Sequence, residues 1–267
     1  MGLLGGLLGI GGSVVMIPAL VFAFGENQHL YQAAAMICNF FVALSSVFVH
    51  HKAQVMVPWV LKRLIPAAVI GIIAGVAWSN SAMFAGSRSY LLARIFGAFL
   101  VYVAVYNSYR FYLELRHGHT EIPKHEAVPH RGLYSILIGA TTGLAAGLMG
   151  IGAGTVAVPL QQVILKMPLR RAISNSAATI VSIAWIGAIY KNATLGRHDI
   201  VFTALKSSSV YLLSLRIAAL VIPGAILGGF WGGHLMHKLP VHWVRAVFIV
   251  VVVVASIRLL SVGPSVS

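Results

Sequence analysis

The sequence predicts an all-α polytopic membrane protein, with about eight transmembrane helices arranged in two homologous halves. Of its 267 residues, 59% are hydrophobic and only 9% are charged, whereas about a quarter of an average soluble domain is charged. The hydrophobic residues gather in eight segments, most of them near the roughly 20 residues that a helix needs to cross a bilayer. A glycine-rich motif also occurs twice, at an offset of 141 residues.

The eight segments divide evenly between the halves. In the first half, residues 1–113, we expect them at 2–24, 31–49, 58–78 and 90–113. A polar connection over residues 114–132 contains Pro123 and Pro129, as loops often do. In the second half, residues 133–267, we expect segments at 133–165, 169–190, 215–236 and 243–260. As a straight helix, the segment 133–165 would be about 50 Å long, so it must tilt, kink or break within a hydrocarbon core of roughly 30 Å.

The charge balance is strongly basic, with 19 Lys and Arg against 5 Asp and Glu and a formal net charge of +14. In a soluble protein this balance would suggest nucleic acid as a partner. Here the basic residues lie mostly at the ends of apolar segments, which is typical of membrane anchoring under the positive-inside rule. We therefore predict the lipid bilayer as a partner, and no nucleic acid. A basic chain also attracts small anions.

The glycine-rich motif is the clearest internal repeat. Residues 5–18 (GGLLGIGGSVVMIP) align with residues 146–159 (AGLMGIGAGTVAVP). Two further matches follow in the same order in both halves, namely Ile65-Pro66 with Ile222-Pro223 and Arg94 with Arg245. Duplicated halves are characteristic of secondary transporters. The second copy has an apolar lead-in over residues 133–145 that the first copy lacks, so we expect part of the first helix to be missing from this sequence.

Each glycine motif lies inside a membrane segment and ends in proline. Glycine permits a positive φ and proline removes a backbone hydrogen bond, so we predict helix breaks at Pro18 and Pro159. Irregular backbone is tolerated within a membrane where it lines a cavity. A helix that restarts after such a loop directs free N–H groups and a partial positive charge into the cavity, which suits an anion. The predicted binding residues are Gly9, Gly11, Gly12 and Ser13 in the first copy, and Gly150, Gly152, Gly154 and Thr155 in the second.

Close helix packing is the alternative explanation for these glycines, because Gly-xxx-Gly spacing lets transmembrane helices approach one another. We favour packing for a second set of glycines, Gly71 and Gly75 with their counterparts Gly228 and Gly232. For the two motifs that end in proline we favour a binding site, since packing alone requires neither two copies nor a following proline.

The segment after each motif contains small polar residues, of which Asn39, Asn175 and Ser176 are predicted to contact the substrate. An amide or hydroxyl inside a membrane segment can hydrogen-bond either a substrate oxygen or a neighbouring helix, and both interpretations stay open. Lys52 and Lys191, near the ends of their segments, could counter an anion. Side chains that extend to the membrane surface are the favoured interpretation for both lysines.

Metal binding is not predicted. No acidic residue lies deep in a segment, and hard cations require oxygen ligands, so the sequence disfavours a carrier of metal cations. The pairs His50-His51 and His234/His237 lack a third ligand and a nearby acid, and are interpreted as polar helix ends. The single cysteine, Cys38, excludes an internal disulfide and is predicted to pack in the core. No cofactor is predicted.

At its motifs the sequence resembles the sulfite exporter TauE/SafE family, also called the toluene sulfonate uptake permeases. The resemblance rests on GLLGIGGSVVMIP, its second copy GLMGIGAGTVAVP, the polar second segment of each half, and RIFG at residues 94–97. It implies a multi-pass carrier in a bacterial inner membrane for sulfite, sulfoacetate or other organosulfonates, and a homodimer is a further expectation. The chain departs from the family pattern at Ser13, where a third glycine is common, and at Ala153.

The favoured hypothesis is a secondary transporter of small anions, sulfite or organosulfonates above all, that works by alternating access between its halves. The alternatives are an anion channel, an ion-coupled uptake permease for another small organic anion and, more distantly, a membrane assembly protein without transport. An enzyme is not expected, because neither Gly-x-Ser-x-Gly nor His-Glu-x-x-His occurs. ATP-driven transport is unsupported, because Gly-x-x-x-x-Gly-Lys does not occur either.

Overall fold

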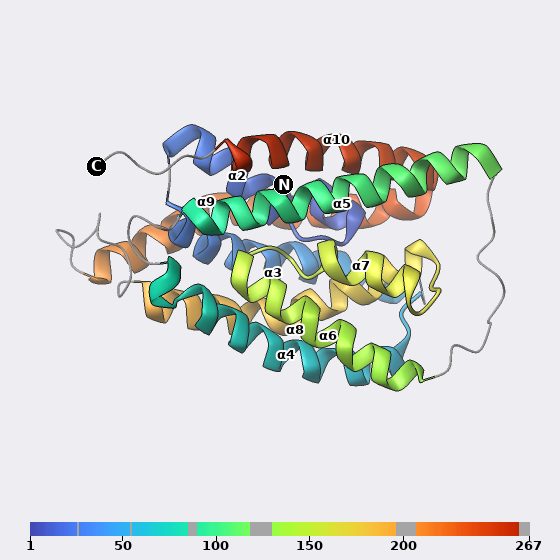
Figure 1. Ribbon diagram of the computed structural model, residues 1–267, viewed down its shortest axis with the longest axis horizontal. Helices are drawn as coiled ribbons and strands as arrows, with labels where there is room; N and C mark the ends of the chain where they lie inside the picture. The colour runs from blue at the N-terminus through green and yellow to red at the C-terminus, as the bar shows by residue number, and fades with distance from the viewer. Residues whose placement is uncertain (26, 54, 85–89, 118–129, 196–206, 262–267) are drawn as a thin grey trace.

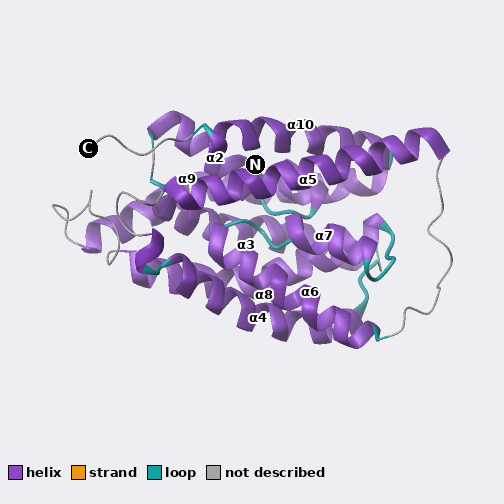
Figure 2. Ribbon diagram, viewed as in Figure 1, coloured by secondary structure: helices purple, strands orange, loops and turns teal. Residues whose placement is uncertain are grey.

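The computed structural model is a bundle of α-helices, described for all residues except 26, 54, 85–89, 118–129, 196–206 and 262–267 (Figures 1 and 2). The first half contains α1 (Gly2–Leu8), α2 (Ser13–Phe24), α3 (Gln28–Lys52), α4 (Pro58–Ser79), the short 3-10 helix η1 (Ala82–Phe84) and α5 (Tyr90–His117). The second half contains α6 (Arg131–Met149), α7 (Gly154–Val163), α8 (Leu169–Thr194), α9 (Ser207–Lys238) and α10 (Val241–Leu260). The described residues contain no strand.

Among the residues that the structure describes, six helices are long and apolar enough to cross a membrane: α3, α4, α5, α6, α8 and α9. The predicted class, an all-α polytopic membrane protein, is thereby confirmed. Helix α9 is continuous from Ser207, whereas the sequence predicts a membrane crossing only from residue 215. Most of the predicted connection, residues 114–132, lies outside the described residues, and its first four residues continue α5 to His117.

The two glycine-rich segments are hairpins rather than straight crossings. A Cβ atom added at Gly12 would meet the side chain of Met1, although 11 residues of continuous helix would separate the two by about 16 Å. In the second half, α6 ends near the middle of the bundle and α7 runs back beside it (Figure 1). The predicted break within residues 133–165 is therefore confirmed, and at this break the chain reverses its direction.

Each half consists of one hairpin followed by three long helices. A hairpin returns the chain to the end of the bundle from which it came, so the three long helices carry it to the opposite end. The second half therefore starts at the end of the bundle opposite to the start of the first half. The two halves thus have the same order of elements and run in opposite directions through the bundle.

Packing between the halves is reciprocal. Helix α1 packs on α9 and α6 packs on α4, while α3 lies against α8 and α5 against α10. A side chain at Gly75 would strike the backbone of α6, and one at Gly232 would strike the backbone of α1. The residues that they would strike are related by the same offset as the motifs: Leu144, Gly147 and Leu148 on α6, and Leu3, Gly6 and Leu7 on α1. The packing interpretation of the second glycine set is therefore confirmed.

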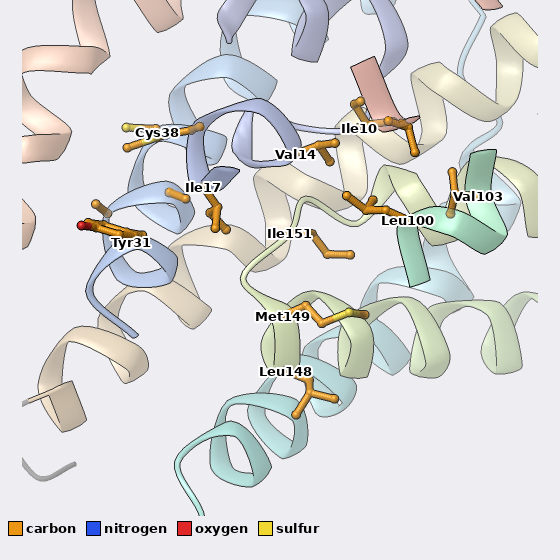
Figure 3. Close-up of a cluster of buried hydrophobic side chains, with 14 of the residues drawn as sticks. Ile10, Val14, Ile17, Tyr31, Cys38, Leu100, Val103, Leu148, Met149 and Ile151 are labelled. Carbon is orange, nitrogen blue, oxygen red and sulfur yellow. The ribbon is translucent and has the colours of Figure 1, made fainter. Parts of the chain in front are cut away.

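Part of the hydrophobic core surrounds the two glycine loops. Ile10 and Ile151, at corresponding positions of the two loops, are both buried and belong to one cluster with Leu100 and Val103 of α5 (Figure 3). Cys38 of α3 is buried in the same cluster, as predicted. Because apolar side chains enclose the loops, their irregular backbone is shielded from lipid.

Candidate functional site

Each hairpin turns on glycines in the left-handed backbone conformation. The φ angles are 62° at Gly9, 76° at Gly11 and 69° at Gly150, values that other residues rarely adopt. The prediction that the helices break at the prolines is wrong, because Pro18 lies inside α2 and Pro159 lies inside α7. Each proline is in the second turn of its helix, where the missing N–H removes one hydrogen bond and the helix continues.

The two glycine loops cross in direct backbone contact. A Cβ added at Gly152 would lie 2.8 Å from the Cα of Gly11, and one added at Gly154 would lie 2.5 Å from the Cα of Ile10. Real Cβ atoms do not approach backbone this closely, so neither position accepts a side chain without separating the loops. The structure thus brings motif glycines from both halves together at the centre of the bundle.

Ser13 and Asn39 tie the two loops to each other. The Asn39 Oδ1 accepts hydrogen bonds from the Gly12 N–H at 2.8 Å and the Ser13 N–H at 3.1 Å, and its amide donates to Ser13 Oγ at 3.0 Å. The same Oγ accepts a hydrogen bond from the Gly152 N–H at 2.9 Å. Both side chains are buried. Contrary to expectation, the Gly12 and Ser13 N–H groups at the start of α2 are not free for an anion, because the Asn39 amide oxygen accepts from both.

A small pocket of about 30 Å³ borders the start of α7 and is lined in part by Gly154 and Thr155 from the second motif. The N–H groups of Gly154 and Thr155 form no hydrogen bond to any described residue. Gln162 and Asn107 also line the pocket. Gln162 is only 7% exposed, and within the described part of the chain its side chain has no hydrogen-bond partner. Unpaired N–H groups and the partial positive charge of a helix start give this pocket the chemistry of an anion site.

Two predicted residues of α8 have different positions. Ser176 reaches the crossing, where its Oγ donates a hydrogen bond to the Gly9 carbonyl at 2.8 Å. Asn175 does not reach it: its Oδ1 accepts from the Val57 N–H at 2.9 Å and its amide donates to Gln161 at 3.2 Å. The two asparagines therefore have different roles. Asn39 binds the first glycine loop, whereas Asn175 on α8 binds the backbone of Val57 and the side chain of Gln161 on α7.

Sequence reasoning missed three polar residues at this site. Thr155, Pro159 and Gln162 are spaced by four and three residues, which places them on one face of a helix. The position of Gln162 beside Thr155 could therefore have been predicted from the sequence. Asn107 comes from α5, where no motif indicates a site. The side chain of Gln32 packs against Gly150 at the second turn, and its amide donates to the Leu148 carbonyl at 3.4 Å. No sequence signal connects Gln32 with that turn.

The described residues contain no group of three or more His, Cys, Asp or Glu side chains that could hold a metal ion. What the site offers instead is a set of N–H, amide and hydroxyl groups at the start of a half-helix. Such groups bind anions and uncharged acceptors rather than hard cations.

Hairpins that meet at the centre of a polytopic helical bundle are a common feature of membrane transporters. The chain belongs to the sulfite exporter TauE/SafE family, whose family model matches residues 1–259. Membrane transport is accordingly the activity of its class.

Curated relatives carry the same general description. The probable membrane transporter protein MamO of Magnetospirillum gryphiswaldense is 25% identical over 97% of this chain, which spans only 43% of that relative. A probable membrane transporter protein of Xylella fastidiosa is 27% identical over 94% of the chain and 88% of the relative. Another from Methanocaldococcus jannaschii is 25% identical over 75% of the chain and 72% of the relative. No solved structure matches the chain.

Proposed function

We propose that this chain is a secondary carrier of small anions in a bacterial inner membrane, and that sulfite and organosulfonates are its substrate class. The pocket at the start of α7 is the observation that carries the proposal. Its free N–H groups and the Gln162 amide are hydrogen-bond donors, and the Thr155 hydroxyl, which donates to the Gly152 carbonyl at 3.3 Å, can rotate toward a ligand. The oxygens of a sulfite or sulfonate group are acceptors with negative charge, which the start of a helix favours. The description of the family as sulfite exporters supports the same class.

Alternating access is the mechanism that we propose, because both halves build the pocket. Leu8, Ile10 and Asn107 come from the first half, and Thr155 and Gln162 come from the second. A rocking movement of one half against the other would therefore open the pocket toward one side of the membrane and close it toward the other. Saturable flux with counterflow in proteoliposomes distinguishes such a carrier from the alternative, an anion channel.

Thermal stabilisation by ligands tests the substrate class. A ligand that binds only the folded protein raises the melting temperature by mass action. We expect a selective increase with sulfite or a short organosulfonate such as sulfoacetate or taurine, compared with chloride and short carboxylates. An equal response to every anion, or a response to carboxylates alone, would contradict the proposed substrate class.

Thr155→Val and Gln162→Leu are expected to weaken this stabilisation without unfolding the protein. Each variant removes a donor from the pocket at nearly constant volume, and one hydrogen bond to a charged ligand contributes about 1.5–3 kcal/mol, or roughly 10- to 100-fold in affinity. Isothermal titration with the anion that stabilises the wild type measures the loss. Thr141→Val is the matched control, because Thr141 lies on α6 and its hydroxyl bonds to carbonyls of its own helix. Wild-type affinity in both pocket variants would exclude this pocket as the binding site.

A further inference from the structure

A histidine pair joins the two halves at one end of the bundle. His50 lies at the end of α3, in the first half, and His237 lies at the end of α9, in the second. The His50 Nδ1 and the His237 Nε2 are 3.2 Å apart, which is the distance of a hydrogen bond. The rings meet edge to face, with their centroids 5.4 Å apart. His50 is fully buried and His237 is partly exposed.

The internal repeat relates this pair to a second polar cluster at the other end of the bundle. The offsets of the repeat, 141 residues for α3 and α8 and 157 for α4 and α9, align three pairs of residues: His50 with Lys191, Arg170 with His29, and His237 with Asn80. In the second cluster the Lys191 Nζ lies 2.8 Å from both the His29 Nδ1 and the Asn80 Oδ1. Corresponding positions thus link the halves at both ends, and one of these links consists of two imidazole rings.

The protons of the histidine pair can be assigned from its surroundings. The His50 Nε2 is buried and has no hydrogen-bond partner among the described residues. Because a buried N–H without an acceptor is costly, the His50 proton belongs on Nδ1, where it is donated to the His237 Nε2. His237 is therefore the acceptor, and its ring is the one that water can reach.

One added proton breaks this arrangement. A proton on the His237 Nε2 turns the acceptor into a donor that faces another donor. His50 could restore the hydrogen bond only by moving its own proton to its buried Nε2, where no acceptor is found. Breaking the pair instead lets the His237 imidazolium turn toward water.

The neighbouring groups add positive charge around the pair. Arg170 at the start of α8 and His234, one turn back on α9, both interact electrostatically with His237. Further basic groups follow along α3, α8 and α9, all of them exposed: His51, Lys52, Arg171 and Lys238. Like charge favours separation of a protonated pair over its retention in a closed contact.

We propose that His50 and His237 form a proton-binding site that works as a latch between the two halves. The neutral pair holds α3 on α9, and the protonated pair releases this end of the bundle. Histidine suits the role because it titrates between about pH 5 and 8. The ligand is the proton. The latch extends the carrier proposed above by making the opening of one end depend on the pH at that end, but it can be tested without any transport substrate.

Hydrogen–deuterium exchange of the wild-type protein in nanodiscs tests the latch directly. Exchange is compared at about pH 5 and about pH 8, after correction for the chemical exchange rate at each pH. We expect peptides at the ends of α3 and α9 to exchange roughly tenfold faster at the acid pH, because local opening becomes easier there. Peptides from the tightly packed contact of α4 with α6 are expected to show no such change. Equal protection of the α3 and α9 ends at both pH values would overturn the proposal.

His237→Asn supplies the decisive variant, because the aligned residue in the other half is Asn80. An amide oxygen accepts a hydrogen bond from His50 whether or not the imidazole is charged, so H237N is expected to stay closed at about pH 5. His234→Asn is the matched control on the same helix and is expected to keep the acid response of the wild type. An acid response in H237N equal to that of the wild type would also overturn the proposal, and would assign the titration to another group. Neither result bears on which anion the pocket binds.

Discussion

Gly152→Ala is expected to reduce anion flux in proteoliposomes by at least about tenfold and to lower the melting temperature. The added methyl group would meet the backbone carbonyl of Ile10, and it would lie 2.8 Å from the Cα of Gly11. A flexible side chain could move aside, but these atoms belong to the backbone of the opposite loop. The loops would have to separate, which would also stretch the 2.9 Å hydrogen bond from the Gly152 N–H to Ser13 Oγ. Overpacking of this kind costs about 1–3 kcal/mol.

Gly224→Ala is the matched control for this experiment. Gly224 lies inside α9, and a Cβ added there meets no atom within 4 Å. The same chemical change should therefore leave flux unchanged and stabilise the helix slightly, since alanine favours helix over glycine by about 1 kcal/mol. Wild-type flux and melting temperature in Gly152→Ala would show that the contact between the two loops is not needed for transport.

The positions of the helices could be predicted from the sequence far better than their direction. From the hydrophobic segments, the sequence predicts that the third and fourth helices start at Pro58 and Tyr90. These are the residues at which α4 and α5 begin. The same signal cannot show that the chain reverses, because an apolar hairpin and an apolar crossing have the same composition. The reversal depends on positive φ angles at Gly9, Gly11 and Gly150. Only the length of residues 133–165 indicated it.

The candidate site was predictable in one half more than in the other. The repeat led to both glycine loops, and the cost of burying an amide led to Asn39, which does contact the first loop. The same reasoning chose Asn175, which binds Gln161 and the backbone of Val57 instead. The alignment of α3 with α8 explains the difference. At the motif offset of 141 residues, Asn39 corresponds to Ile180 and Asn175 corresponds to Ala34. The two asparagines resemble each other only in their local sequence.

The burial of Lys191 could not be predicted from its local sequence. A lysine near the end of an apolar segment normally extends to the membrane surface, and that interpretation is wrong here because Lys191 is fully buried. Its Nζ donates hydrogen bonds to Ser79 Oγ at 2.7 Å, Asn80 Oδ1 at 2.8 Å and His29 Nδ1 at 2.8 Å. These partners come from two other helices of the first half, so only the folded arrangement brings them to one point. The other His29 nitrogen, Nε2, lies 3.0 Å from the Phe84 carbonyl and must donate to it, which leaves Nδ1 as the acceptor for Lys191.

Lys191→Met is therefore expected to be among the most destabilising single substitutions in the chain. Methionine fills a similar volume but donates no hydrogen bond, so the substitution leaves two buried acceptors and one partly buried acceptor without this donor. Each buried polar group that loses its partner costs about 1–3 kcal/mol. A total of several kcal/mol corresponds to a decrease of roughly 6–12 °C in melting temperature for a chain of this size. Differential scanning fluorimetry of the purified protein in detergent measures it.

Two companion variants separate the lost hydrogen bonds from the lost charge. Lys52→Met removes an exposed lysine near the end of α3 and should shift the melting temperature by no more than about 2 °C. Lys191→Arg keeps the positive charge but presents it as a planar fork, which cannot direct three donors to the points that the ammonium group reaches. We expect it to fall between the wild type and Lys191→Met. If Lys191→Arg matched the wild type, charge alone would hold this end of the bundle together. If Lys191→Met matched Lys52→Met, the three hydrogen bonds would contribute nothing to the link between α8 and the first half.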